Sequence, residues 1–511
     1  MNRSPRTPTD PRQERLAPPP PIGAPSSPVV VVVGAGIAGL TAAVALAERD
    51  VEVHVLERED YLGGRVGAWP HRLNDGTEIT MSRGFHAFFR QYYNLRALLA
   101  RTDASLSRLT PVEDYPLIDR AGRVDQFRGL PRKPPWNAIA FALRSPTFKL
   151  TDLLRLNGRA ALPLATVRVP DIYERLDDLS AEQLLDAINF PEPARHLAFE
   201  VFSRSFFARP GDLSAAELAV MFHLYFLGSS EGLLFDVPND TFATALWEPL
   251  RDYLVSLGAD VRTGTPVQSV ERGGDRRYRV HLATGSIDAD AVVLATDLGG
   301  LRQLVASSPQ LGTTTWRDTI AGLRTAPPFF VHRLWLDRPV DAHRPAFLGT
   351  GGWGQLDNIS VLDRYEGEAQ RWARQHGGSV VELHAYAAAP SGTRDYPDLA
   401  DDLLSMLRTI YPETARATVV DSVSLWRDDC PLFAPGSFTS RPRVTTPDDG
   451  IVLAGDGIRV DLPVALMERA ATTGLVAANA LLSSFGLRGH EVLSVPNRSR
   501  IRVLDRFATR S

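Results

Sequence analysis

A long apolar stretch of the chain without charged residues, Val29 to Ala47, begins with five consecutive valines. β-Branched residues favour a buried strand. Three glycines follow the valines, and an alanine-rich helix is predicted from Thr41 to Glu48. The stretch is long enough to suggest a membrane span. However, a strand, a glycine turn and a helix in this order predict the start of a βαβ unit that is buried on both faces.

The glycine turn matches the pattern G-x-G-x-x-G of dinucleotide-binding sites. Its first glycine permits a tight turn, its second lets the backbone approach a pyrophosphate, and its third allows close helix–strand packing. A second strand, Val51 to Leu56, ends at Glu57, which is about 20 residues beyond the turn and suited to ribose hydroxyls. The matching residues are Gly34, Gly36, Ile37, Ala38, Gly39 and Glu57.

Two later parts of the chain carry compatible strand patterns. A strand is predicted over Ala259 to Glu271, followed by a hairpin over Tyr278 to Thr296. Near the C-terminus, a short apolar strand begins at Ile451 and ends in Gly455-Asp456, and a helix is predicted from about Ala465. The order of these pieces predicts one discontinuous nucleotide-binding domain.

Composition excludes several classes of protein. The chain has 511 residues, 56 basic and 60 acidic side chains, and a net charge of -4, which is not the basic footprint of a nucleic-acid-binding protein. Its single cysteine, Cys430, excludes a disulfide framework, a cysteine-rich zinc site and a cysteine-ligated iron–sulfur cluster. No metal site is predicted. The only lysines are Lys133 and Lys149.

Residues 61–65, YLGGR, resemble the Gly-Gly-Arg loop of FAD enzymes related to amine oxidases and carotenoid desaturases. The resemblance implies an FAD cofactor held by the glycine turn and Glu57, with a helix N-terminus facing the flavin. It also implies further contacts to the cofactor from Arg58, Gly64, Arg65, Val267, Gly455, Asp456 and Met467.

Residues 82–94, SRGFHAFFRQYYN, resemble a motif of phytoene and ζ-carotene desaturases. Residues 465–474 are similar to a second motif of these enzymes, although Arg469 replaces a glycine. From about residue 28 to 485 the chain resembles actinobacterial carotene desaturase/methyltransferases of the isorenieratene synthase type. This resemblance implies desaturation of β-ionone end rings with intramolecular methyl migration, which gives aromatic rings.

The resemblance also implies a fold and its division. The predicted fold class is α/β, a Rossmann-like FAD-binding domain of the Gly-Gly-Arg type interleaved with an α+β substrate domain. The FAD domain comprises 28–100, 240–300 and 440–485, and the substrate domain with its helical cover comprises 101–239 and 301–439. A disordered proline-rich tail, 1–27, and a basic C-terminal tail, 486–511, complete the chain.

Aromatisation of a ring requires a proton acceptor and exclusion of water. His86 is the first candidate for the base because its unperturbed pKa lies near neutrality, and a structural role of this histidine is the alternative. Arg83 and Glu231 are further catalytic candidates. The aromatic faces of Phe88, Phe89 and Tyr92 are predicted to contact the substrate and to stabilise a cation.

Three other functions stay open. The chain is also compatible with a phytoene or ζ-carotene desaturase or isomerase, an amine oxidase-like flavoenzyme, or a non-catalytic isoprenoid carrier of the GDP-dissociation-inhibitor type. In many amine oxidases a lysine lies near the flavin, whereas the comparable-looking strand, Phe329 to Leu336, has none. The intact glycine turn, Glu57 and Gly455-Asp456 argue against the carrier.

The partner is expected to be a lipophilic carotenoid, with quinone or oxygen as electron acceptor. No signal peptide or transmembrane helix is recognised, and we expect a cytoplasmic protein, peripheral on the inner face of the cell membrane. Trp136 to Leu156 is predicted to be helical with a break at Pro146. It lies either in the membrane interface or over the substrate domain.

Overall fold

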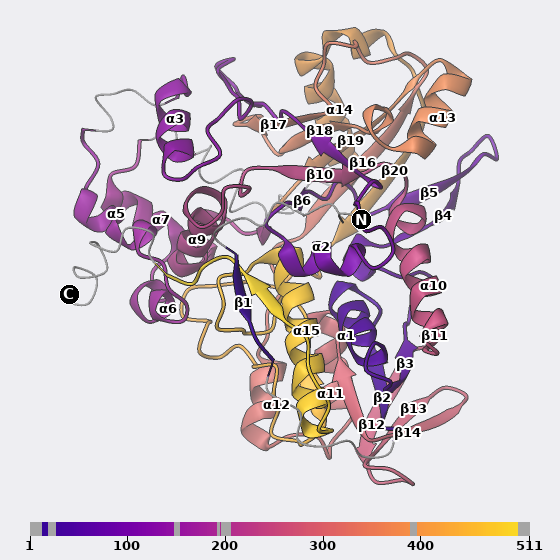
Figure 1. Ribbon diagram of the computed structural model, residues 1–511. Coiled ribbons are helices and arrows are strands. Elements are labelled where there is room, and N and C mark those ends of the chain that lie inside the picture. The colour runs from indigo at the N-terminus through magenta and orange to yellow at the C-terminus, as the bar shows by residue number, and fades with distance from the viewer. Residues whose placement is uncertain are drawn as a thin grey trace, which may run out of the picture.

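A parallel sheet of five strands forms one half of the molecule (Figure 1). The computed structural model describes residues 13–18, 27–147, 154–191, 195, 206–388 and 396–498. In this sheet the five valines of β2 lie between neighbours on both sides, and Val31 pairs with His54 and Val292. The strand order is β11 (Asp260–Arg262), β3 (Glu52–Leu56), β2 (Val29–Val33), β15 (Ala291–Leu294) and β21 (Ile451–Leu453).

Two helices pack side by side on this sheet, α1 (Ile37–Ala47) and α15 (Leu466–Ser484). Their contact is close because Gly474 has no side chain, and a Cβ there would lie 2.3 Å from the carbonyl oxygen of Ala38. The charge-free segment that begins at Val29 is therefore a strand, a turn and a buried helix, as its pattern predicts. Among the described residues, no helix is long and apolar enough to cross a bilayer.

Antiparallel strands extend the domain beside the parallel sheet. The predicted strand over Ala259 to Glu271 is in fact two strands, β11 and β12 (Val267–Arg272), which belong to different sheets. The predicted hairpin is β13 (Tyr278–Leu282) with β14 (Gly285–Ala289), and the chain then leaves it to form β15 in the parallel sheet. A further hairpin pairs β4 (Ala68–Arg72) with β5 (Glu78–Ser82).

A seven-stranded mixed sheet forms the other half, with α13 (Gly367–His376) and α14 (Tyr396–Ile410) packed near it (Figure 1). Strand β16, which lies next to the edge strand β20, is buried along its whole length. The strand order is β20 (Val419–Arg427), β16 (Phe329–Leu336), β19 (Ser379–Ala385), β18 (Asn358–Val361), β17 (Phe347–Gly351), β8 (Leu117–Asp119) and β9 (Val124–Asp125).

A layer of helices and a small sheet complete the structure. The small sheet has the order β6 (Phe88–Phe89), β10 (Phe235–Pro238) and β7 (Leu109–Val112). The helices of the layer are α3 (Trp136–Arg144), α5 (Gly158–Ala165), α6 (Asp171–Leu176), α7 (Ala181–Ile188) and α9 (Ala215–Phe222). Helix α7 begins at a capping box, in which Ser180 and Gln183 bond each other's backbone amides.

The remaining helices connect these layers. The α-helices are α2 (Tyr93–Leu99), α10 (Glu248–Ser256), α11 (Leu298–Ala306) and α12 (Thr314–Ala321). Two π-helical turns, η4 (His223–Leu227) and η5 (Ala243–Trp247), extend α9 and precede α10. The 3-10 turns are η1 (Gly64–Val66), η3 (Pro210–Asp212), η6 (Leu362–Arg364) and η7 (Pro412–Arg416). The α/β fold class predicted from sequence is confirmed.

The prediction of a disordered N-terminal tail is wrong for residues 14–16. These residues form β1 (Glu14–Leu16), which pairs antiparallel with β22 (Val492–Ser494) of the predicted basic C-terminal tail. The local sequence does not predict this pairing, because neither strand has a clear alternating pattern of apolar and polar residues. Similarly, α3 ends at Arg144, earlier than the predicted break, and residues 148–153 of the predicted helix lie outside the described part of the chain.

A buried ion cluster ties α9 to α15. Glu217 is fully buried, and its carboxylate pairs with Arg441 and, at 2.8 Å, with Arg469. Burial alone raises the pKa of Glu217, but the two guanidinium groups outweigh it and lower the pKa to about 2. The departure from the family motif at Arg469 is thereby explained, because this arginine has a buried partner on another helix.

We predict that Glu217→Gln strongly destabilises the protein, because two buried arginines lose their counter-charge. Breaking a buried ion pair on one side costs about 3–5 kcal/mol. Thermal unfolding followed by circular dichroism measures the change. The matched control is Glu413→Gln, which removes the more exposed pair with Arg344 and should cost at most about 1 kcal/mol. Equal midpoints for the two variants would contradict the prediction.

Candidate active site

A cavity of about 690 Å³ lies at the carboxyl ends of β2, β3 and β15 and reaches the seven-stranded sheet. Ligands of open α/β sheets bind at this edge. One end of the cavity is lined by the glycine turn and its neighbours, and the other end is lined by aromatic side chains. The aromatic residues are Phe85, Phe89, Tyr92, Tyr115, Phe207, Phe235, Phe329, Phe347 and Tyr386.

Two glycine loops face each other at the nucleotide end. Gly34 has a φ of +100°, which a residue with a side chain rarely adopts. Gly36 and Gly64 line the cavity, and a Cβ on Gly64 would lie 3.1 Å from the Cα of Gly36. Gly39 lies behind the turn, where a Cβ would be 1.9 Å from the carbonyl oxygen of Gly34. The loops therefore leave an open backbone surface in front of α1.

The carboxylate of Glu57 is fixed beside this surface. It accepts hydrogen bonds from the backbone amides of Ala35, at 2.7 Å, and Glu59, at 2.9 Å. Burial raises the pKa of Glu57, and the two amide donors act in the opposite direction. Arg58 and Val267 line the same end of the cavity. A carboxylate held in this way can accept hydrogen bonds from the hydroxyls of a ribose.

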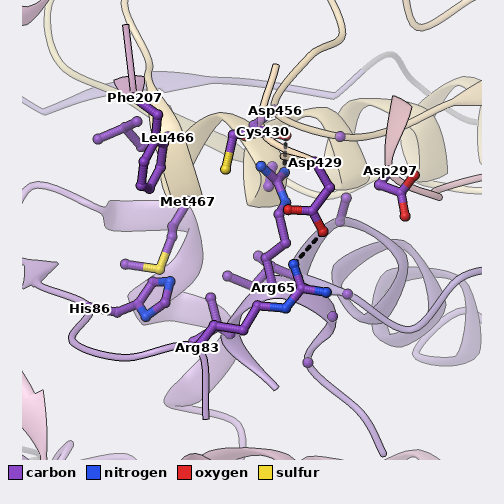
Figure 2. Close-up of a pocket in the computed structure, with 18 of the residues that line it drawn as sticks. Arg65, Arg83, His86, Phe207, Asp297, Asp429, Cys430, Asp456, Leu466 and Met467 are labelled. Atoms are coloured by element: carbon purple, nitrogen blue, oxygen red, sulfur yellow. Dashed lines mark hydrogen bonds and ion pairs between the residues drawn. The ribbon is translucent and has the colours of Figure 1, made fainter. Parts of the chain in front are cut away.

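Two arginines mark the middle of the cavity (Figure 2). Arg65 pairs with Asp456, and Arg83 pairs with Asp429. Burial acts to lower the pKa of Arg83, but the Asp429 carboxylate outweighs it and raises the pKa above its ordinary value. Arg65 lies after β3 and Arg83 directly after β5, whereas Asp429 follows β20 and Asp456 follows β21, so groups far apart in sequence meet here.

The N-terminus of α15 opens into the cavity. Leu466, Met467 and Ala470 line the wall, and no side chain caps the helix at Ala465. Leu466 has a φ of +55°, and the neighbouring Phe207 has a φ of +53°. Figure 2 shows Phe207 beside Leu466 and Met467. Non-glycine residues in this conformation are strained and cluster at functional sites, and the free helix N-terminus favours negative charge.

The two carotenoid-desaturase motifs meet in a buried hydrogen-bond cluster. Oε1 of Glu468 accepts from the backbone amide of Asn94 at 2.8 Å and from its side chain at 2.9 Å. Oε2 accepts from the amide of Leu95 at 3.0 Å. Burial raises the pKa of Glu468 to about 8 against the effect of these donors. The glutamate therefore bonds the first turn of α2, and the motif residues position two helices relative to each other.

His86 lines the cavity close to Met467 (Figure 2). Its Nδ1 lies 2.9 Å from the carbonyl oxygen of Gly84, so this nitrogen carries the hydrogen and donates it. The ring stands edge-on to Phe242, with centroids 5.6 Å apart. Burial lowers the pKa of His86 to about 4. The imidazole is therefore neutral near pH 7, and its Nε2 has a lone pair that can accept a proton.

The structure brings most of the predicted site residues to this cavity. The predicted cofactor residues line it, except Gly39, which packs behind the turn; among the other candidates, Phe89, Tyr92, His86 and Arg83 line it as well. Phe88 does not, because it is fully buried in the core. Glu231 does not line the cavity either: it lies in a turn before β10, where its amide bonds the hydroxyl of Ser229.

Several cavity residues were not predicted. His384, Tyr386, Asn358 and Phe207 come from segments that fold onto the site only through the tertiary structure. The sequence offers a pattern for one pair. Glu382 and His384 are two residues apart on a strand, so both side chains lie on the same side of it. The sequence does not tell which side faces the cavity.

Comparison with known proteins identifies the family. The flavin-containing amine oxidoreductase family matches residues 37–482. The chain belongs to this family. The prediction of a flavin-dependent oxidoreductase is thus confirmed. The chain is 58% identical to a carotenoid φ-ring synthase from Streptomyces griseus, over 94% of this chain and 93% of that protein. It is 25% identical to a ζ-carotene desaturase from Synechocystis sp., over 89% of this chain and 97% of that protein.

Solved structures show the same fold at low sequence identity. A wild-type putrescine oxidase bound to putrescine has a TM-score of 0.65 and 16% identity, covering 89% of this chain and 99% of that one. A reduced UDP-galactopyranose mutase has a TM-score of 0.62 and 14% identity, covering 89% and 96%.

The residues present fit a flavin nucleotide. Gly36 and Gly64 leave a bare backbone surface, Glu57 presents a carboxylate, and the open N-terminus of α15 lies farther along the same cavity. The backbone amides and positive end of a helix suit the pyrophosphate. A flavin held there supplies an acceptor for hydrogen and electrons taken from a substrate at the aromatic end.

We predict that Gly36→Val abolishes flavin binding, because its side chain would enter the space between the two glycine loops. The purified variant should be colourless, while its circular dichroism stays that of a folded protein. The control is Gly158→Ala, since a Cβ at Gly158 meets no other atom within 4 Å. Full flavin absorbance in the valine variant would refute this assignment of the cofactor site.

Proposed function

We propose that the protein is an FAD-dependent oxidoreductase of the isorenieratene synthase type, which desaturates the β-ionone end rings of a carotenoid and makes them aromatic. The observation that carries this proposal is the 58% identity to a carotenoid φ-ring synthase along 94% of the chain. The aromatic end of the cavity agrees with a lipophilic polyene as substrate. We also propose the division into interleaved FAD and substrate domains given by the sequence.

The proposed reaction sets demands on the protein. Each ring loses two hydride equivalents and two protons, and one methyl group moves from the quaternary carbon to its neighbour. Oxidised FAD, when bound, takes up the hydride equivalents, and quinone or oxygen is the proposed final electron acceptor. The chain itself must hold the ring, keep water from the cationic ring and accept the protons.

The cavity walls supply groups for these tasks. Phe85 packs against Phe347 at 4.5 Å, and Phe89 packs edge-on against Tyr225 at 4.7 Å. Such faces exclude water and stabilise a nearby cation through their quadrupoles. We propose Nε2 of His86 as one proton acceptor, because its other nitrogen is committed to Gly84.

We predict that co-expression with a β-carotene pathway yields pigments with aromatic end rings. Each converted ring should be lighter by four hydrogen atoms in mass spectrometry, with the carbon count unchanged. Matched cells that carry the Gly36→Val variant should keep β-carotene. Desaturated phytoene with intact β-rings would instead support a plain desaturase, the alternative favoured by the similarity to ζ-carotene desaturase.

Experiments on the purified protein test two further alternatives. Oxidation of an amine would support an amine oxidase, although the described residues that line the cavity include no lysine. Binding of an isoprenoid by protein that never takes up flavin would support a carrier. Both outcomes would overturn the proposed carotenoid chemistry.

We further propose that helix α3 brings the protein to a membrane surface. Trp136 and Leu143 are each 61% exposed, and Ile139 on the same face is 43% exposed. Helical positions separated by three or four residues share a face. Basic Lys133 and Arg144 lie at the two ends of the helix. An apolar face between basic residues suits an interface with anionic lipid.

The other face of α3 adjoins the aromatic end of the cavity. Phe141 of α3 stacks on Phe127 at 4.9 Å, and Phe127 stacks on Tyr115 at 4.4 Å. Tyr115 in turn packs on Phe235 at 4.8 Å, and both residues line the cavity. A carotenoid taken from the lipid would thus meet a continuous aromatic surface between the membrane and the site.

We predict that the double variant Trp136→Ser, Leu143→Ser binds vesicles of mixed anionic and neutral phospholipid at least about tenfold more weakly. Each lost apolar side chain removes about 1.5–3 kcal/mol of burial. Co-sedimentation measures the bound fraction. The control is Val255→Ser on α10, which alters another exposed apolar residue. Unchanged binding of the double variant would exclude α3 as the membrane-binding surface.

A further inference from the structure

A chain of hydrogen-bonded side chains runs through neighbouring strands of the seven-stranded sheet and ends at the cavity. Arg333 on β16 pairs with Glu382 on β19 at 2.7 Å. Nε2 of His384 lies 3.4 Å from the other oxygen of Glu382, and Nδ1 lies 3.0 Å from the hydroxyl of Tyr386. Asn358 donates to the same hydroxyl at 2.9 Å. His384, Tyr386 and Asn358 line the cavity, whereas Arg333 and Glu382 are buried behind it.

The hydrogen bonds of this series of side chains all run in one direction. Burial alone raises the pKa of Glu382, but Arg333 and His384 outweigh it and lower the pKa to about 2, so the carboxylate is ionised. An ionised carboxylate only accepts hydrogen bonds. Nε2 of His384 must therefore carry the hydrogen that faces Glu382. Nδ1 then has the lone pair and accepts the hydrogen of the Tyr386 hydroxyl.

Arg333, at one end of this series of hydrogen bonds, is held in place by several partners. Besides Glu382, Arg333 donates to the carbonyl oxygen of Thr80 and the hydroxyl of Ser82, both at 2.9 Å. Its charge offsets that of the carboxylate inside the sheet. The arrangement of a carboxylate, a histidine and a hydroxyl is that of a general base whose imidazole is oriented by the acid.

We propose that Tyr386, backed by His384, is a second proton acceptor for the ring reaction; this inference rests on the proposed function. A cationic ring loses a proton from carbon, and the electrons of the broken C–H bond form a ring double bond. The proton passes to the hydroxyl oxygen of Tyr386 while Tyr386 gives its own proton to Nδ1 of His384. The positive charge moves from the ring to the imidazole, where the Glu382 carboxylate stabilises it.

The location of Tyr386 suits this role. Its ring packs edge-on against Phe207 at 5.2 Å, and Phe207 lies beside Leu466 and Met467 at the start of α15 (Figure 2). The acceptor thus lies near the helix end that is expected to face the flavin. His384 packs against Gly84, where a Cβ would lie 2.4 Å from Cε1 of His384, and the carbonyl oxygen of Gly84 bonds His86. Each ring releases two protons, and the cavity offers two acceptors.

We predict that Tyr386→Phe forms aromatic rings about 100-fold more slowly, because general-base catalysis contributes at least that factor. His384→Gln should behave in the same way. Flavin content and β-carotene binding of the purified holoenzyme should stay unchanged. The control is Tyr411→Phe, since Tyr411 lies outside the cavity and its buried hydroxyl has no hydrogen-bond partner in the described structure.

A pH profile separates catalysis from a structural role. In the wild type, the rate should fall toward acidic pH because a relay that already holds a proton cannot accept another, and the residual rate of Tyr386→Phe should lack this decline. The groups that face His384 are Glu382, Tyr386 and, across the cavity, His86, with Arg333 behind Glu382. A purely structural role would lower flavin content or stability and leave the acidic limb in place.

The outcomes distinguish the two proposals. Incompletely desaturated or hydroxylated rings from Tyr386→Phe support the proton relay from Tyr386 to His384, because a cationic ring that keeps its proton is exposed longer to water. Aromatic rings formed at the wild-type rate by this variant overturn the relay and leave the proposed function intact. A wild type that leaves β-rings unchanged overturns the proposed function and the relay together.

Discussion

The first turn of α15 is the constraint on which the site depends. Leu466 and Met467 face the cavity, Glu468 bonds the start of α2, and Arg469 pairs with Glu217 on α9. Four successive residues thus connect α2, the helical layer and the cavity wall. The strained φ of Leu466 is tolerated because Glu468 and Arg469 fix the turn to α2 and α9. A change here would move the helix end, the substrate wall and the ion cluster at once.

Buried charges beside the cavity are neutralised locally, which keeps its aromatic end apolar. Arg65 meets Asp456, Arg83 meets Asp429, and Arg333 meets Glu382. An isolated charge in such surroundings would cost several kcal/mol. The two histidines of the cavity have different hydrogen-bond partners. Nδ1 of His86 donates to a carbonyl oxygen, and burial lowers the pKa of this histidine, whereas Nε2 of His384 faces a carboxylate.

Local sequence signals predicted the nucleotide end well. The valine strand, the glycine turn and Glu57 lie within one βαβ unit, so their spacing determines their geometry. The aromatic end was predicted less completely. Phe89, Tyr92 and His86 line the cavity, but Phe88 points into the core, since alternate residues of a strand face opposite sides. Glu231 was selected for its charge alone, and its loop turns elsewhere.

The sequence by itself determined the family, the class of cofactor and the two glycine loops at one end of the cavity, because these depend on short-range patterns. Only the tertiary structure decided which distant groups meet. His384 lines the cavity and Glu382 lies behind it on the same face of β19, because β19 pairs with β16 in one register, and a shift of one residue would turn both away. The pairing of residues 14–16 with 492–494 likewise joins segments that are far apart in the sequence. Such contacts depend on how strands and helices pack, and local patterns do not encode that packing.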